Sequence, residues 1–126
     1  MSHFWLGCAV GIGAVLGALL RWGAGMLFNA VWAGFPLGTL LVNASGGLLA
    51  GMAFVVFGRY PNEALRLLLV TGFLGGLTTF STFSAESLSL LEKGRFDLAA
   101  VHTTAHVLGA LACAALGARL MRWYLG

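Results

Sequence analysis

The stretch GFLGGLTTFSTFS, residues 72–84, determines how this chain is interpreted. It lies inside a long apolar segment that otherwise has the composition of a membrane-spanning helix. Two adjacent glycines, a cluster of hydroxyl side chains and two phenylalanines three residues apart interrupt that segment. Non-helical backbone at membrane depth is tolerated only where protein buries it or where it lines a wet cavity. The stretch therefore indicates an ion site or a transport pathway within the bilayer.

The composition of the whole chain is that of an integral membrane protein. Of its 126 residues, 60% are hydrophobic and 9% are charged, and the mean hydropathy is +0.93. Soluble domains carry about 25% charged residues. Seven basic and four acidic residues are too few and too scattered for a nucleic-acid-binding surface. We therefore expect a single transmembrane domain over residues 1–126, with no nucleic-acid partner.

Four apolar segments are each long enough to cross a bilayer core, which takes about 20 helical residues. They run from about Phe4 to Trp32, Thr39 to Phe57, Ala64 to Leu91 and Leu98 to Leu120. The predicted fold class is an all-α membrane protein of four transmembrane helices with a break in the third. The first segment lacks a preceding basic region, so we interpret it as a retained helix. Cys8 and Cys113 lie in apolar segments and are expected to be free thiols.

The charged residues barely fix the orientation of such a bundle. An even number of spans places both termini on one side. That side carries Arg59, Arg66, Arg119 and Arg122, and the other carries Lys93 and Arg95, with Arg21 towards it. The positive-inside rule weakly favours cytoplasmic termini. Two alternatives remain open: one unique orientation, or a pair of copies inserted in opposite directions.

Small residues recur at spacings that let helix backbones approach closely. The pairs are Gly7 and Gly11, Gly13 and Gly17, and Gly47 and Gly51, and Gly109, Cys113 and Gly117 continue the pattern in the fourth span. Because four short helices enclose little volume, we expect an oligomer. Packing within one chain is the alternative explanation for these pairs.

Phe80 and Phe83 are three residues apart, so they share one helix face. Such a pair alone is typical of lipid-facing or core packing, but here hydroxyl side chains lie between the two rings. A phenyl ring has a positive edge, so two ring edges beside serine and threonine donors could accept a small anion. Asn43 could offer two amide hydrogens to the same ion.

Gly75 and Gly76 suggest a second device, because a helix broken there leaves carbonyls without intrahelical partners. Inward-facing carbonyl oxygens suit a hard cation such as sodium. A simple kink relieved by threonine hydroxyls is the alternative. For Arg21, the alternatives are snorkelling to the interface, pairing with Glu86, or attracting anions into a vestibule.

His102 and His106 are spaced as the metal or haem ligands of one helix can be. The sequence places no third ligand of the right type near them, so we interpret them as polar residues along a pore or an interface. No combination of nucleophile, base and orienting group stands out, and an enzyme is not expected.

Three motifs resemble the Fluc (CrcB) fluoride channel family. They are GALLRW at residues 17–22, GTLLVNASGG at 38–47 and the opening stretch at 72–84. The resemblance covers the first three spans by motif and the whole chain by length and number of spans. It implies a passive, fluoride-selective channel of the cell inner membrane that exports fluoride and so gives fluoride resistance. It also implies an antiparallel dual-topology homodimer with two pores and a structural sodium ion that is not transported.

The resemblance also assigns roles to individual residues. The pore positions matched in this way are Arg21, Thr39, Asn43, Phe80, Ser81, Thr82, Phe83, Ser84 and Glu86, and the backbone positions of the sodium site are Gly75 and Thr78. The fourth span departs from the family pattern, in which a tyrosine is followed four residues later by a serine. His102 and His106 occupy these places, which suggests a pH effect because histidine titrates near neutrality.

Two other functions remain as alternatives. One is a small multidrug-type proton-coupled transporter, which needs a carboxylate within the membrane, and Glu86 is the candidate for that role. The other is a non-transporting assembly subunit, or a haem-binding bundle that uses His102 and His106.

Overall fold

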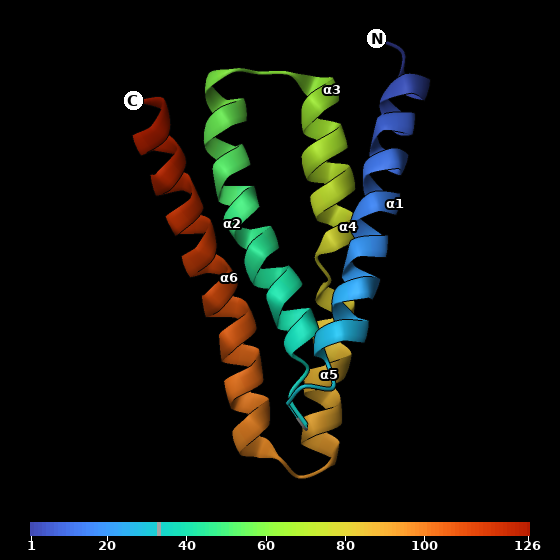
Figure 1. Ribbon diagram of the computed structural model, residues 1–126, viewed down its shortest axis with the longest axis vertical. Coiled ribbons are helices and arrows are strands. Elements are labelled where there is room, and N and C mark those ends of the chain that lie inside the picture. The colour runs from blue at the N-terminus through green and yellow to red at the C-terminus, as the bar shows by residue number, and fades with distance from the viewer. Residues whose placement is uncertain (33) are drawn as a thin grey trace.

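The computed structural model describes residues 1–32 and 34–126, and every regular element in them is helical (Figure 1). The elements are α1 (His3–Phe28), α2 (Leu37–Arg59), α3 (Glu63–Arg66), η1 (Leu67–Leu74), α4 (Gly75–Leu77), α5 (Phe80–Glu92) and α6 (Phe96–Leu125). Four helices are long and apolar enough to cross a membrane, the third being the bent series from α3 to α5. This confirms the predicted all-α class with four spans and an interrupted third. Both termini lie at the same end of the bundle (Figure 1).

The ends of the spans differ from the predicted ones by a few residues. The first helix ends at Phe28 rather than Trp32. Asn29 follows it, and its Oδ1 accepts a hydrogen bond from the N–H of Thr39 at 3.1 Å. This contact fastens the end of α1 to the first turn of α2 and satisfies one of the free N–H groups there. The last helix is longer than predicted and continues to Leu125.

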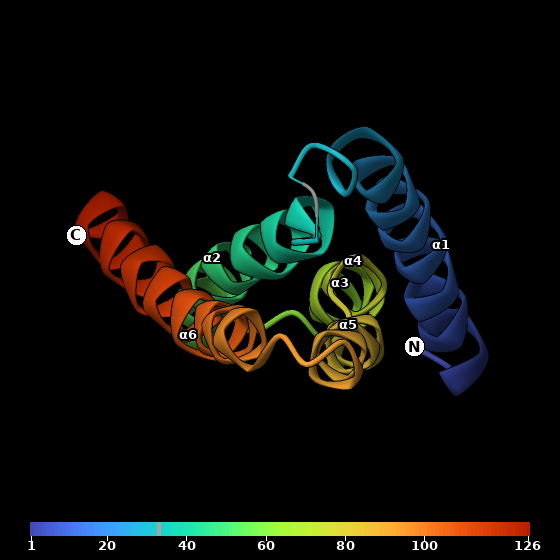
Figure 2. The same ribbon diagram turned by 90° about the horizontal axis from the view of Figure 1, so that it is seen from below.

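The second and last spans pack along each other (Figures 1 and 2). Gly47 and Gly51 of α2 lie directly against the backbone of Ala110 and Ala114 of α6. A methyl group at either glycine would overlap a carbonyl oxygen of α6. Small residues therefore allow close backbone contact between these helices, as the spacing predicted.

The first span packs in the same way along η1 and α4. A methyl group at Gly13 would meet the carbonyl oxygen of Leu68, and one at Gly17 would meet that of Phe73. Several of the predicted glycine contacts are thus made within the chain. A methyl group at Gly7, Gly11 or Gly109 would instead enter open space, with no atom of another helix within 4 Å among the described residues.

The break in the third span was predicted from Gly75 to Thr78, and the structure confirms only its last residue. Gly75 has helical dihedral angles (φ −63°, ψ −36°), so a break at the two glycines is wrong. The extended residues are Thr78 (φ −88°, ψ 156°) and Thr79 (φ −149°, ψ 117°). Gly76 serves close packing instead, since a methyl group there would meet the backbone of Ala14. The π-helical winding of Leu67–Leu74 was not predicted.

Candidate ion-conduction site

Asn43 of α2 replaces the backbone hydrogen bonds that the third span loses at its break. Thr79 N–H donates to Asn43 Oδ1 at 2.8 Å, and Asn43 Nδ2 donates to the carbonyl oxygen of Thr79 at 3.0 Å. In a continuous helix the same N–H would bond the carbonyl of Gly75, four residues earlier. Thr78 instead bonds back to the carbonyl of Leu74, through both its N–H (3.0 Å) and its Oγ1 (2.8 Å).

Two helix ends therefore face the break from opposite sides. The α4 helix presents carbonyl oxygens, among them that of Gly75, at a helix C-terminus. The α5 helix presents the N–H groups of Phe80 and Ser81 at a helix N-terminus, while the N–H of Thr82 is capped by Thr79 Oγ1 at 3.1 Å. A helix N-terminus favours anions and a C-terminus favours cations. The break thus brings together the two helix ends at which the sequence analysis expected an anion path and a cation site, and both sites stay predictions.

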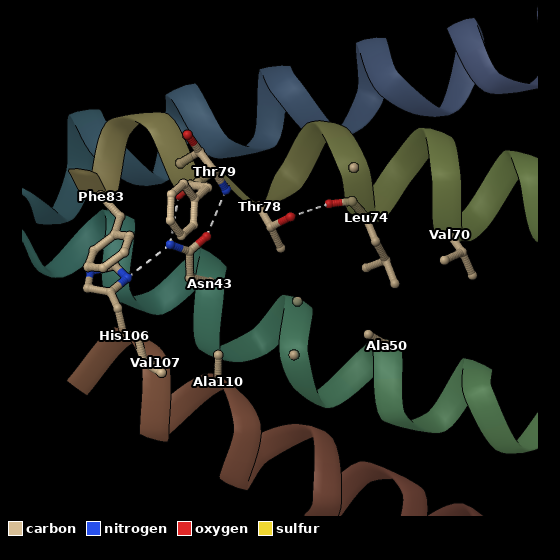
Figure 3. A pocket seen from close by; sticks show the side chains of 14 residues that line it. Asn43, Ala50, Val70, Leu74, Thr78, Thr79, Phe83, His106, Val107 and Ala110 are labelled. Atoms are coloured by element: carbon tan, nitrogen blue, oxygen red, sulfur yellow. Dashed lines mark hydrogen bonds between the residues drawn. The ribbon is translucent and has the colours of Figure 1, made fainter. Parts of the chain in front are cut away.

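An open groove of about 530 Å³ lies beside the break and is lined by α2, the third span and α6, as Figure 3 shows. Asn43, Thr79, Phe80, Phe83 and His106 form its polar and aromatic end. Thr78 and a set of small and aliphatic residues form the remainder of the walls. Phe80 is 78% exposed and Phe83 is 7% exposed. The groove therefore brings together residues of α2, the third span and α6 that are distant in sequence.

The two phenylalanines meet edge to face, with ring centroids 5.4 Å apart and planes at 76°. One face of Phe83 is covered by imidazole rings, at centroid distances of 4.6 Å to His106 and 5.6 Å to His102, both with planes at 27°. An anion is repelled by the negative face of a phenyl ring, so the positive edge of Phe83 is the part that could contact one.

Glu86 and His102 are the centre of a polar network beneath these rings. Thr39 Oγ1 donates to Glu86 Oε2 at 2.7 Å, and His102 Nε2 lies 3.2 Å from Glu86 Oε1. His102 is fully buried, and its Nδ1 lies 2.8 Å from Ser87 Oγ. The network connects α2, α5 and α6 at membrane depth, where an unpaired carboxylate would be costly.

Arg21 does not pair with Glu86 in the described part of the chain, so that alternative is wrong. Its Nε donates to the carbonyl oxygen of Gly76 at 3.0 Å. Arg21 lines a second cavity, of about 370 Å³, together with Asn29, Thr39 and Thr82. A guanidinium beside such a cavity would attract anions.

The expectation that the two histidines have no third ligand nearby is also wrong. Donor atoms of Glu86, His102 and His106 lie within 4.8 Å of one another. Glu86 is 16 residues before His102 in the sequence, so only the packing of α5 on α6 brings it there. One oxygen and two nitrogens make a donor set that zinc accepts.

Comparison with known proteins identifies the family of this chain. Residues 8–118 match the family described as CrcB-like protein, Camphor Resistance (CrcB). The chain belongs to the CrcB family. The resemblance inferred from the three motifs is therefore confirmed, and four apolar spans in such a family indicate a multi-pass membrane protein.

Several similar proteins carry the name fluoride-specific ion channel FluC. One from Pseudomonas aeruginosa is 50% identical over 120 residues, covering 94% of each chain. One from Aromatoleum aromaticum is 50% identical over 111 residues, covering 86% of this chain and 85% of its own. One from Acinetobacter baylyi is 44% identical over 116 residues, covering 91% of this chain and 92% of its own. These names are those of channels, in agreement with the prediction that this CrcB-family chain is not an enzyme.

The remaining predicted residues lie around the break. Ser81 and Ser84 are exposed on α5; Ser84 Oγ donates to the carbonyl of Phe80 at 2.8 Å, and Ser81 Oγ lies 3.4 Å from Thr79 Oγ1. Gly75 and Thr78 both line the open groove. Their roles as ion ligands stay predictions.

Sequence reasoning missed the importance of Thr79 and Ser87. Thr79 caps α5, and a threonine that directly precedes a helical run is a recognisable N-cap signal. Its pairing with Asn43 had no such signal, because the two residues are 36 positions apart. Ser87 gave none either, since its contacts are with α6.

Proposed function

We propose that this CrcB-family protein is a passive fluoride channel. The observation that carries the proposal is about 50% identity, over 94% of the chain, to a protein named fluoride-specific ion channel. The site supports it, because the break brings a helix N-terminus and the rings of Phe80 and Phe83 into one groove, where Asn43 holds the extended backbone of Thr79 in place.

Fluoride is strongly hydrated, so a narrow pore must replace its water with other hydrogen-bond donors. The hydroxyl groups near the break, the N–H groups of α5 and the ring edges of Phe80 and Phe83 are neutral donors, which bind an anion without holding it. Conduction requires binding that is strong enough for entry and weak enough for release. The vestibule around Arg21 would supply anions, and the narrowness of the path would exclude chloride.

The exposure of this groove supports a homodimer. The polar groups of the groove, among them those of Asn43 and Thr79, would face lipid in a single chain, and polar residues at membrane depth are expected to face protein or water. A second copy inserted in the opposite direction would cover the groove, and the weak charge bias permits both orientations. Such an antiparallel dual-topology dimer would place two breaks side by side and create two pores.

A sodium ion fits the carbonyl side of the break. The hydrogen bond between Thr79 and Asn43 releases the carbonyl of Gly75, and the extended backbone of Thr78 turns its own carbonyl out of the helix. Hard cations prefer oxygen ligands. Gly75 and Thr78 from both copies would hold a structural sodium ion, which would stabilise the dimer and would not be transported.

Export follows if the channel lies in the inner membrane of a cell with a negative interior. A potential of 100 mV acts on one charge with about 2.3 kcal/mol, which corresponds to an equilibrium ratio of about 50-fold. A passive channel would therefore lower cytoplasmic fluoride and give resistance to it.

The test of this proposal in cells is growth on fluoride of a bacterium that lacks its own fluoride exporter. The protein should restore growth on fluoride and leave growth on high chloride unchanged; failure to restore growth in cells that contain the folded protein would overturn the export function.

The dimer is tested separately with Ser2→Cys in a background of Cys8→Ser and Cys113→Ser. An impermeant thiol reagent should label a fraction near one half of the chains from outside, whereas labelling of all or none would contradict dual topology.

The sodium site is tested by fluoride efflux from liposomes. Replacing sodium by a large organic cation should slow this efflux, and an unchanged rate would contradict the sodium site.

A further inference from the structure

The amide of Asn43 has one orientation, because the backbone of Thr79 meets both of its ends. Asn43 Oδ1 accepts from the N–H of Thr79 at 2.8 Å, and Nδ2 donates to its carbonyl oxygen at 3.0 Å. Turning the amide over would place oxygen against oxygen and one N–H against another, so both bonds would be lost. Thr79 therefore fixes which end of the Asn43 amide is the donor.

The second hydrogen of this amide fixes the tautomer of His106. Asn43 Nδ2 lies 2.9 Å from His106 Nδ1, and the nitrogen of an asparagine amide can only donate. His106 Nδ1 must therefore offer its lone pair, and a neutral imidazole then carries its proton on Nε2. Figure 3 shows these contacts leading from Thr79 through Asn43 to His106.

The Nε2–H of His106 is a buried donor without an acceptor. The residue is 4% exposed, and its Nε2 has no hydrogen-bond partner among the described residues. The ring is held on one face by Phe83, with centroids 4.6 Å apart, and at Nδ1 by Asn43. Buried donors are rarely left unpaired in proteins, so the position indicates a ligand that accepts a hydrogen bond.

We propose that the Nε2–H of His106 is a fluoride-binding donor and that Asn43 is the positioning residue that holds it in this tautomer. The inference rests on the proposed function and deepens it. The sequence analysis suggested that both amide hydrogens of Asn43 bind the ion. In the structure these hydrogens are donated to Thr79 and to His106, so Asn43 orients His106 instead of binding the ion itself.

The neighbouring carboxylate explains why such a site would release its ion. A donor atom of Glu86 lies within 4.8 Å of His106, and both Glu86 oxygens already accept hydrogen bonds, from Thr39 and from His102. The carboxylate is therefore held in place and repels an anion bound beside it. A neutral N–H donor opposed by this charge gives the weak binding that conduction needs.

The tautomer also decides between an anion and a metal ion at this place. Zinc would need a lone pair of His106; that of Nδ1 faces the N–H of Asn43, and that of Nε2 exists only if the proton moves to Nδ1. The proton would then face the N–H of Asn43, and the two donors would repel each other. The observed contacts therefore favour an anion over zinc at the group of Glu86, His102 and His106.

Histidine-selective ¹⁵N NMR of the full protein tests the tautomer, at about pH 8.5, where an ordinary histidine is neutral. The signal lost in His106→Gln identifies the residue, and it should show the proton on Nε2. Fluoride should move this Nε2–H signal downfield, while the same concentration of chloride should leave it unchanged.

The variant Asn43→Asp tests the positioning role. Its carboxylate offers only acceptors to His106, so the proton of the His106 ring should move to Nδ1. A proton on Nδ1 in the unmodified protein, or no response to fluoride, would overturn the inference.

Fluoride efflux from liposomes tests the function of the donor. His106→Phe keeps a stackable ring without an N–H and should slow efflux by about tenfold or more, equivalent to about 1.4 kcal/mol. His106→Gln keeps a donor and should retain more of the rate. Equal rates for His106→Phe and the unmodified protein would overturn the inference and leave the proposed channel function standing.

If the unmodified protein released no fluoride, the proposed function would fail, while NMR would still report the tautomer of His106. Block by zinc that disappears in His106→Gln would also overturn the inference, and no block is expected.

Discussion

Thr79 and Asn43 exchange two hydrogen bonds across the break in the third span, at 2.8 Å and 3.0 Å. Asn43 thereby supplies to Thr79 both the acceptor and the donor that a continuous helix would have supplied. This pair explains how an extended backbone is stable at membrane depth, where an unsatisfied peptide group is costly. It also joins α2 to the third span at the place where the ion path is proposed.

Replacing Asn43 by alanine should therefore affect both stability and conduction. Two backbone groups of Thr79 would lose their partners, and an unsatisfied buried group costs about 1–3 kcal/mol. We expect a lower midpoint of unfolding in mixed micelles and at least tenfold slower fluoride efflux (about 1.4 kcal/mol). Leu41→Ala is the matched control, because Leu41 is a 48% exposed residue of the same helix. Equal stability of Asn43→Ala and Leu41→Ala would contradict the role given to this pair.

Gly17→Ala tests the close contact between α1 and the third span. The added methyl group would meet the carbonyl oxygen of Phe73 and lie 2.6 Å from the N–H nitrogen of Leu77. Overpacking against backbone costs about 1–3 kcal/mol, so the denaturant midpoint should fall. Gly7→Ala on the same helix has open space around it and should be neutral or slightly stabilising. Comparable losses in the two variants would show that α1 packs differently.

Glu86→Gln separates a channel from a proton-coupled transporter. Glutamine keeps an acceptor for Thr39 and removes the charge that opposes a bound anion, so fluoride efflux should slow, but by less than about tenfold, or 1.4 kcal/mol. A transporter that exchanges protons through this carboxylate would lose coupled transport completely. Glu92→Gln, an exposed charge change at the end of the same helix, is the control. The measurement is efflux with and without a proton gradient, and a rate that follows the gradient would support the transporter.

Arg21 should act mainly through its charge at the vestibule. Arg21→Gln should slow efflux at low fluoride by about tenfold at low ionic strength, and added salt should reduce the difference. Arg21→Lys keeps the charge and should retain more of the rate, although it changes the contact with the carbonyl of Gly76. Arg119→Gln, an exposed arginine at the opposite end of the bundle, should have no effect. A salt-independent loss would instead indicate that the hydrogen bond to Gly76 is the important contact.

The sequence predicted the spans and the existence of the break, because both depend on local composition. It misplaced the break, since Gly75 and Gly76 are as suitable for close helix packing as for a change of direction. The contact of Gly76 with Ala14 of α1 decides between these uses, and it depends on tertiary structure. The hydrogen bonds of Thr79 and Asn43, and the approach of Glu86 to His102, likewise join segments that no local pattern relates.

The most direct test of passive, selective fluoride conduction is efflux from liposomes that contain the purified protein. Vesicles loaded with potassium fluoride or potassium chloride are diluted into impermeant anion, and valinomycin is added to carry the balancing potassium. Fluoride should leave rapidly, while chloride should leave no faster than from protein-free vesicles. Fluoride retained in the vesicles, or chloride that leaves as quickly as fluoride, would contradict the account.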